Sequence, residues 1–206
     1  MSQTDKRYAP AVQRNKDPIF RVLKGYLPQQ GNILEIASGS GEHCVYFASR
    51  LPEHMFYPAD AEENALASIE AHRKQSRLGN IKPAQKLDVQ TPFWWKDLCS
   101  NICFGAVLCI NMVHIAPWEA AKGLMSGASK CLNPEGLLVL YGPYFEESVR
   151  PAPTNIDFDR SLKSKNPEWG IRDISDMIAL GRQNSLELYA RHEMPANNLT
   201  LIFKRI

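Results

Sequence analysis

The sequence of 206 residues lacks features that would place it in several classes of protein. No apolar run approaches the ~20 residues needed to cross a bilayer. The N-terminus, Met-Ser-Gln-Thr-Asp-Lys-Arg, has no apolar core of a signal peptide. No Cys-x-x-Cys pair and no histidine cluster shows metal-ligand spacing. These absences predict a cytoplasmic protein with no membrane segment and no metal.

The sequence also lacks a large excess of positive or negative charge. The net charge is only +2, and no block of like charge stands out, so nucleic acid is an unfavoured partner. Cysteine is sparse, odd in number and mostly set in apolar surroundings, which favours reduced core thiols over disulfides or zinc. The five cysteines are Cys44, Cys99, Cys103, Cys109 and Cys131.

The composition is that of a globular protein, with 44% hydrophobic and 22% charged residues. We expect one domain over 1–206. Residues 1–16 are polar and predict an N-terminal arm, after which Asp17-Pro18 indicates the start of a helix. Residues 145–171 are rich in proline and predict an insertion over the pocket, with a short helix near 158–162.

Apolar runs and helical patterns alternate along the chain. This alternation predicts an α/β fold with a mostly parallel sheet and helices on both faces. Two final strands without a helix between them predict an antiparallel pair at one edge. The expected strands cover 32–37, 54–59, 84–89, 104–110, 136–141, 186–191 and 199–205.

The most informative stretch is Asn32–His43, where an apolar strand pattern stops at small residues and a helical pattern follows at once. Such a glycine turn presents bare backbone N–H groups and a helix N-terminus. Acids end or follow the first three strands, at Glu35, Asp60 and Asp88. Ligands of such sheets bind beyond the carboxyl ends of the strands. A single acid of this kind is more often a helix cap or a solvated loop residue, but all three together favour a cofactor site.

The identity of the cofactor follows from charge. Cys44 occupies the place where the dinucleotide fingerprint needs Gly or Ala, and Glu35 would repel a pyrophosphate. A ligand with an amine, a sulfonium, ribose hydroxyls and an adenine amine suits three carboxylates. S-adenosylmethionine has these groups.

Glu35-Ile-Ala-Ser-Gly-Ser-Gly41 resembles the Glu-x-Gly-x-Gly-x-Gly turn of class I S-adenosylmethionine-dependent methyltransferases, with Ala37 in the first glycine position. The chain more closely resembles the family of methyltransferase-like protein twenty-six. The resemblance implies a Rossmann-like, seven-stranded, mostly parallel sheet with an antiparallel last strand. The matching stretches are Ala37–His43, Ile110–Trp118, Leu140–Pro143, Phe158–Leu162, Pro167–Asp173 and Met194–Asn198.

The resemblance also implies roles in holding S-adenosylmethionine, with S-adenosylhomocysteine as product. Ala37, Ser38, Gly39 and Gly41 would border the methionine part, and Glu35 would engage its amine. Asp60 would accept from the ribose hydroxyls and Asp88 would contact the adenine edge. Asn111 would approach the methionine amine through its carbonyl or side chain.

Methyl transfer depends mainly on positioning, and a base is needed only for a protonated acceptor. His114, three residues past the fourth strand, is a candidate base; a cap of the following helix is equally compatible with its position. Asn111 and Tyr144 complete the catalytic candidates. Asn111-Met-Val-His114 is not the Asn-Pro-Pro-Tyr type of amino-methylating enzymes, which argues against a base-flipping activity on nucleic acid.

Polar residues of the insertion would roof the pocket and favour a small polar acceptor. Asp159 could instead pair with Arg172 as a loop clasp, and Asn197 and Asn198 are also common turn residues. Arg14 and Asn15 could fold over the cofactor as a lid or belong to a disordered arm. The substrate or lid candidates are Arg14, Asn15, Asn155, Asp159 and Asn198.

Three functions remain in view. The first is a methyltransferase acting on a small molecule. The second is a non-catalytic module that keeps the cofactor pocket as a sensor or partner surface. The third, a nicotinamide-dependent oxidoreductase, is disfavoured by Cys44 and by the final strand pair. The sequence predicts no oligomeric state.

Overall fold

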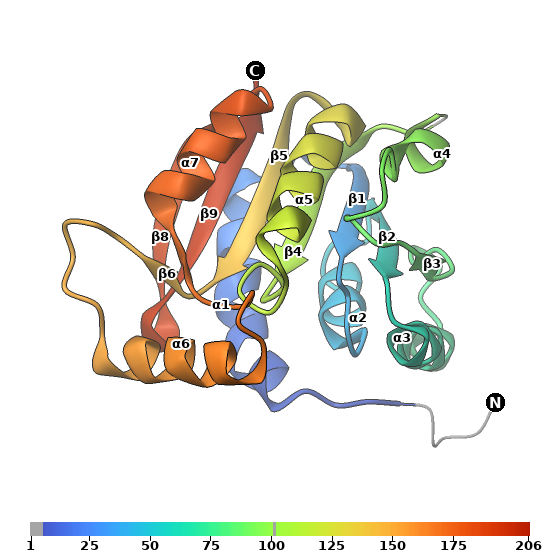
Figure 1. The fold of residues 1–206 in the computed structure, drawn as a ribbon. Helices are drawn as coiled ribbons and strands as arrows, with labels where there is room; N and C mark the ends of the chain where they lie inside the picture. The colour runs from blue at the N-terminus through green and yellow to red at the C-terminus, as the bar shows by residue number, and fades with distance from the viewer. Residues whose placement is uncertain (1–5, 101) are drawn as a thin grey trace.

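A computed structural model describes residues 6–100 and 102–206, built on a seven-stranded sheet with strand order β3-β2-β1-β4-β5-β9-β8 (Figure 1). Strands β1 to β5 pair in parallel, whereas β9 runs antiparallel to both of its neighbours, β5 and β8. The predicted mostly parallel sheet with an antiparallel last strand is therefore confirmed. The strands are β1 (Gly31–Ile36), β2 (His54–Asp60), β3 (Gln85–Lys86), β4 (Phe104–Ile110), β5 (Leu132–Gly142), β8 (Leu186–Met194) and β9 (Asn198–Arg205).

Helices cover both faces of the sheet. In Figure 1, α5 and α7 lie in front of the sheet and α1 lies behind it, while α6 runs below the strands. A separate two-stranded parallel pair joins β6 (Tyr144–Phe145) to β7 (Arg172–Asp173). The helices are α1 (Pro10–Tyr26), α2 (Glu42–Ala48), α3 (Glu63–Ser76), α4 (Trp95–Cys99), α5 (Trp118–Cys131), α6 (Pro153–Lys165) and α7 (Ile174–Gln183).

The central strands are apolar on both sides because successive side chains enter opposite cores. In β4, Ala106 and Leu108 face the core beneath α1 and α2. Val107 and Cys109 face the core beneath α5 and α7. This double burial explains why the sequence of β4 is continuously apolar rather than alternating.

The start of α1 differs from the prediction. The helix begins at Pro10, so residues 10–16 are helical rather than an arm, and Asp17-Pro18 lies inside the helix. Residues 1–5 of the predicted arm lie outside the described residues. A buried stripe that includes Val12, Ile19 and Leu23 runs past Pro18. Burial of this stripe outweighs the one backbone hydrogen bond that Pro18 removes.

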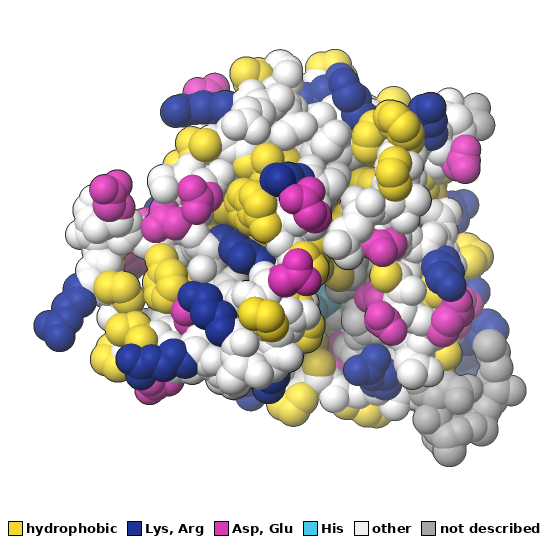
Figure 2. Space-filling model, viewed as in Figure 1, with side chains coloured by type: hydrophobic (Ala, Val, Ile, Leu, Met, Phe, Trp, Pro, Cys, Tyr) yellow, Lys and Arg dark blue, Asp and Glu magenta, His cyan; other side chains and the backbone are white. Residues whose placement is uncertain are grey.

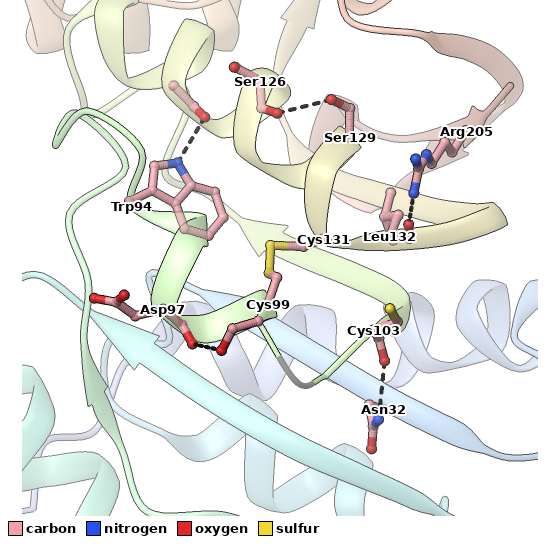
Figure 3. The surroundings of a disulfide bond; sticks show 12 residues. Asn32, Trp94, Asp97, Cys99, Cys103, Ser126, Ser129, Cys131, Leu132 and Arg205 are labelled. Carbon is pink, nitrogen blue, oxygen red and sulfur yellow. Dashed lines mark hydrogen bonds between the residues drawn. A yellow bond between two sulfur atoms is a disulfide. The ribbon is translucent and has the colours of Figure 1, made fainter.

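The prediction of five reduced cysteines is also wrong, because Cys99 at the end of α4 forms a disulfide with Cys131 at the end of α5 (Figure 3). The two cysteines are 32 residues apart in sequence, and the packing of α4 on α5 brings them together. Beside them, the Trp94 indole N–H donates to the Gly123 carbonyl at 3.0 Å. Cys44 and Cys109 are buried free thiols, and Cys103 is an exposed one.

Two further boundaries need correction. The third strand pairs with β2 only at Gln85–Lys86, so Asp88 lies two residues past its end. The helix of the insertion runs over Pro153–Lys165, well beyond the predicted 158–162.

In the part of the chain that the structure describes, no helix has both the length and the apolar character to cross a membrane.

Candidate functional site

The turn between β1 and α2 takes left-handed backbone conformations at three positions. The φ angles are +55° at Ala37, +59° at Gly39 and +84° at Gly41. A Cβ on Gly41 would lie only 2.8 Å from the Ile69 Cα, so α3 packs directly on the turn. Ala37 thus occupies, as a non-glycine residue, a conformation that a methyl group disfavours.

Asp60, at the end of β2, holds this turn in place. Its Oδ2 accepts a hydrogen bond from the Gly39 N–H at 2.8 Å, and its Oδ1 accepts from the Glu62 N–H at 3.0 Å. The side chain is buried, but each oxygen keeps a lone pair for a further donor. Asp60 can therefore order the turn and still accept from a ligand hydroxyl.

A hollow of about 430 Å³ opens beside the turn, and we call it the glycine-turn hollow. Asp60 and Asp88 both line it, together with Ala37 and Gly39. Asp88 is ordered by its own loop, since its Oδ1 accepts from the Gln90 N–H at 2.9 Å. The carboxyl edge of the sheet thus brings two of the three predicted acids to one cavity.

Glu35, the third acid, lies beneath the turn rather than on the wall of the hollow. It is only 2% exposed, and its Oε2 has no hydrogen-bond partner among the described residues. Burial raises the pKa of the Glu35 carboxyl to about 7, and the charge of Asp60 acts in the same direction. The Ser38 hydroxyl donates to the Glu35 carbonyl at 3.0 Å and so fixes the backbone above the buried carboxyl.

A second hollow of about 700 Å³ adjoins the first, and we call it the α6 hollow. The two share Ile115, which is exposed. Asn111, at φ +63°, and His114 line the α6 hollow just after β4. The predicted residues that line it are Arg14, Asn111, His114, Asn155 and Asn198 and, through a buried side chain, Asn15.

His114 is 5% exposed, and none of the described residues forms a hydrogen bond with its ring nitrogens. The ring stacks edge-on against Phe158, with centroids 5.6 Å apart. Burial lowers the pKa of the His114 imidazole to about 4, and the Arg172 guanidinium lowers it further. No side chain caps the start of α5, so the capping role considered for His114 finds no contact in the described residues.

Asn15 belongs to a buried polar chain behind the α6 hollow. Its Oδ1 lies 2.8 Å from the His43 Nε2. Burial lowers the pKa of His43 to about 4, so this ring is neutral at pH 7. The contact supports the expectation that His43 is structural.

Three predicted residues are placed differently from expectation. Tyr144 is buried in the core, where burial raises its pKa well above the usual value, and it lines neither hollow. Asp159 accepts from the Ile171 N–H at 2.9 Å and pairs with Lys163 at 2.6 Å. Arg172 donates instead to backbone carbonyls, so the suggested direct Asp159–Arg172 clasp is wrong.

The asparagines at the α6 hollow are partly committed to local structure. Asn155 Nδ2 donates to the Asn197 carbonyl at 3.0 Å, which ties α6 to the turn between β8 and β9. Asn198 Nδ2 donates to the carbonyls of Pro195 and Ala196. The turn role considered for Asn198 is thus present, and the residue also lines the α6 hollow.

The sequence interpretation missed the segment 6–9, which we call the N-terminal strap. The Arg7 N–H donates to the Ser68 Oγ at 2.8 Å, and the Arg7 carbonyl lies 3.0 Å from the His72 Nε2. Tyr8 packs edge-on against His72, and Arg7 lines the glycine-turn hollow. A charged, aperiodic terminus carries no pattern that indicates such a contact. Ile115, Tyr141 and Trp169 are further wall residues that were not singled out.

Comparison with solved structures shows the same fold. An O-methyltransferase family protein from Burkholderia thailandensis is 14% identical with a TM-score of 0.79, over 95% of this chain and 57% of that one. Human N-acetylserotonin methyltransferase in complex with SAM is 10% identical with a TM-score of 0.75, over 95% and 52%. A putative methyltransferase from Bacillus halodurans C-125 is 14% identical with a TM-score of 0.70, over 93% and 98%. The fold is thus that of class I methyltransferases.

Among curated proteins, a tRNA (guanine-N(7)-)-methyltransferase from Erythrobacter litoralis (strain HTCC2594) is 32% identical over 90 residues. These residues are 43% of this chain and 35% of the relative, so the chain matches about a third of that protein's length. A family model described as "Protein of unknown function (DUF938)" matches residues 6–205. The chain therefore belongs to this family of unknown function, and it has the fold of class I methyltransferases.

Proposed function

We propose that this protein transfers a methyl group from S-adenosylmethionine to a small-molecule acceptor. The observation that carries the proposal is the pair of adjoining hollows at the carboxyl edge of the sheet. The glycine-turn hollow would take the cofactor and the α6 hollow the acceptor. Their shared wall at Ile115 is where the methyl group would cross.

The residues of the glycine-turn hollow fit this cofactor. Asp60 and Asp88 offer carboxylate oxygens to ribose hydroxyls and to an adenine amine. Glu35 lies beneath the turn with one oxygen unpartnered, as a buried carboxyl awaiting a cation would. The three acids on the wall, Asp60, Glu62 and Asp88, disfavour the pyrophosphate of a nicotinamide cofactor, since Arg7 is the only basic residue on the described wall.

The bound cofactor would supply a methyl group on a positively charged sulfur. This chain would bind and orient it: the glycine turn gives close backbone approach, and Asp60 fixes the turn. Ile115, Met112 and Trp169 give the hollow an apolar wall that would shield the bound methyl group from water. Asn111 and His114 would bound the acceptor side, where His114 can accept a proton only weakly at its lowered pKa.

The proposal predicts binding of S-adenosylmethionine and S-adenosylhomocysteine, but not of NAD, in isothermal titration. Tight binding of NAD alone would overturn it. Incubation with methyl-labelled cofactor and a filtered metabolite extract then separates an enzyme from a binding module. Transfer of label to a metabolite supports the enzyme, whereas cofactor binding without transfer from any extract supports the module.

Glu35 predicts a pH dependence of cofactor binding. A cationic amine favours the ionised carboxyl, whose pKa without ligand is about 7. We expect affinity for S-adenosylhomocysteine to rise roughly tenfold between pH 5.5 and 7.5, at most one decade per pH unit below the pKa. Titration of wild type and Glu35→Gln across this range is the measurement, and the variant should show a flat profile.

The stability of the ligand-free protein should depend on pH in the opposite direction to the affinity for the cofactor. Because the folded pKa lies above the ordinary 4.5, the native state holds its proton more tightly between about pH 4.5 and 7. The contribution of Glu35 to stability therefore falls as pH rises through this window. The melting temperature is measured against pH for wild type and for Glu35→Gln, and the difference between the two curves should show that fall. Identical curves would contradict the raised pKa of the buried Glu35 carboxyl.

A further inference from the structure

The α6 hollow is electrostatically one-sided. Arg14 is its only ionised wall residue, and no Asp or Glu belongs to the described wall. No described residue forms an ion pair or hydrogen bond with the Arg14 guanidinium. The glycine-turn hollow next to it is the reverse, with Asp60, Glu62 and Asp88 on its wall. The cofactor side therefore suits a cation, and the acceptor side suits an anion.

Two helices begin at the α6 hollow, and one of them adds to this field. Ala11 and Arg14 come from the first turns of α1, and Thr154 and Asn155 come from the first turn of α6. Neither helix has an acid in its first turn or a side chain that caps its N–H groups. At α1 the Glu42 carboxylate offsets the positive charge of the helix end, because it accepts from the N–H of the N-cap residue Ala9 at 2.7 Å. The N-terminus of α6, which has no acid in its first turn, therefore contributes the positive helix end at this wall.

A buried polar group without a partner also faces this space. His114 lines the hollow, and its residue surface is only 5% exposed. No described residue forms a hydrogen bond with its ring nitrogens. Asn111, beside it, likewise makes no side-chain hydrogen bond within the described residues. Because buried polar groups are normally satisfied, the buried His114 indicates a polar ligand in this hollow, and the half-buried Asn111 beside it offers a second polar contact.

The wall also restricts the chemistry of the acceptor. An alcohol or protonated amine must lose a proton during methylation, and the base must be on the wall. Burial lowers the pKa of His114 to about 4 and raises the pKa of Tyr141, so neither group takes up a proton readily at pH 7. An acceptor that arrives already ionised needs no base.

We propose that the acceptor is a small carboxylate, bound by Arg14 and the N-terminus of α6, and that its carboxylate oxygen takes the methyl group. This inference rests on the proposed methyl transfer. A lone pair of the oxygen forms the new C–O bond while the methyl C–S bond breaks and its electron pair stays on sulfur. The anion and the sulfonium cancel, so the products are a neutral methyl ester and S-adenosylhomocysteine, and no proton is released.

Binding is tested first, with the protein saturated with S-adenosylhomocysteine. Matched probes are benzoate against benzamide and phenylacetate against phenylacetamide, measured by titration calorimetry. We expect each carboxylate to bind at least tenfold more tightly than its amide, and Arg14→Gln to abolish the difference. Arg21→Gln removes an exposed cation of the same helix away from the hollow and should keep it. Equal binding of the members of each pair, or none of either, overturns the proposal.

The product is tested second, with methyl-labelled cofactor and a filtered metabolite extract. Methyl esters release labelled methanol in mild alkali, whereas ethers and methylamines keep the label. We expect the label to be alkali-labile. An alkali-stable label would overturn the carboxylate acceptor while the proposed methyl transfer stands. A protein that fails to bind S-adenosylmethionine would instead overturn the proposed function itself.

Discussion

Asp60→Ala should lose at least about 100-fold in affinity for S-adenosylmethionine and remain folded. The carboxylate accepts from the Gly39 and Glu62 N–H groups and lines the glycine-turn hollow. Hydrogen bonds to a charged group contribute about 1.5–3 kcal/mol each, and a factor of 100 corresponds to roughly 2.7 kcal/mol. The variant loses both the ligand acceptor and the order of the turn. Titration calorimetry measures the affinity, and circular dichroism checks the fold.

Two variants separate the causes. Asp60→Asn keeps one acceptor oxygen and should retain part of the affinity. Glu63→Ala removes an exposed neighbouring acid that pairs with Lys86 instead of lining the hollow, so its affinity should equal that of wild type. Wild-type affinity in Asp60→Ala, or an equal loss in Glu63→Ala, would refute the assignment of Asp60.

Gly123→Ala should lower stability by about 3 kcal/mol, the upper end of the usual cost of overpacking. A Cβ on Gly123 would lie 1.9 Å from the Val89 carbonyl oxygen, which is backbone and cannot rotate away. Helix α5 must therefore move from the 88–90 loop, whose residues line the glycine-turn hollow. A thermal melt should show a fall of roughly 6–12 °C. Cofactor affinity should fall as well.

Gly25→Ala is the matched control, because the same substitution there meets open space. No heavy atom lies within 4 Å of a Cβ on Gly25, near the end of α1. Alanine is the better helix former, so this variant should melt at the same temperature or a few degrees higher, by at most about 1 kcal/mol. Parallel melts that show equal losses for the two glycines would disprove the close approach of α5 to residue 89.

The sheet could be predicted because periodicity and strand-end residues are local signals. The continuously apolar β4 and the glycine turn after β1 are each readable within about a dozen residues. The start of α1 was not readable in this way, because Asp17-Pro18 is a strong local signal for the start of a helix, whereas the helix begins at Pro10. Only burial of Ile19 and Leu23 against a distant sheet explains the place of Pro18 inside a helix.

In the candidate site as well, the residues set by local sequence signals could be predicted, and those set by long-range packing could not. Asp60 and Asp88 could be placed at one cavity because parallel strands end at one edge. The burial of Tyr144 and the bonds of Asp159 depend on how residues 145–171 fold back, and no short pattern encodes that path. The Cys99–Cys131 pairing depends likewise on the docking of α4 against α5.

The N-terminal strap has a practical consequence for anyone who produces this protein. Residues 6–9 cross α3, and Arg7 reaches the glycine-turn hollow, while Ile206 ends the chain at the opposite end of the molecule (Figure 1). The face in view mixes basic and acidic side chains, so a charged affinity tag would have no single-sign surface there to adhere to (Figure 2). A tag at the N-terminus would join the described chain at residue 6, next to the Arg7 that lines the hollow, so we expect it to hinder ligand entry. Purification handles therefore belong at the C-terminus.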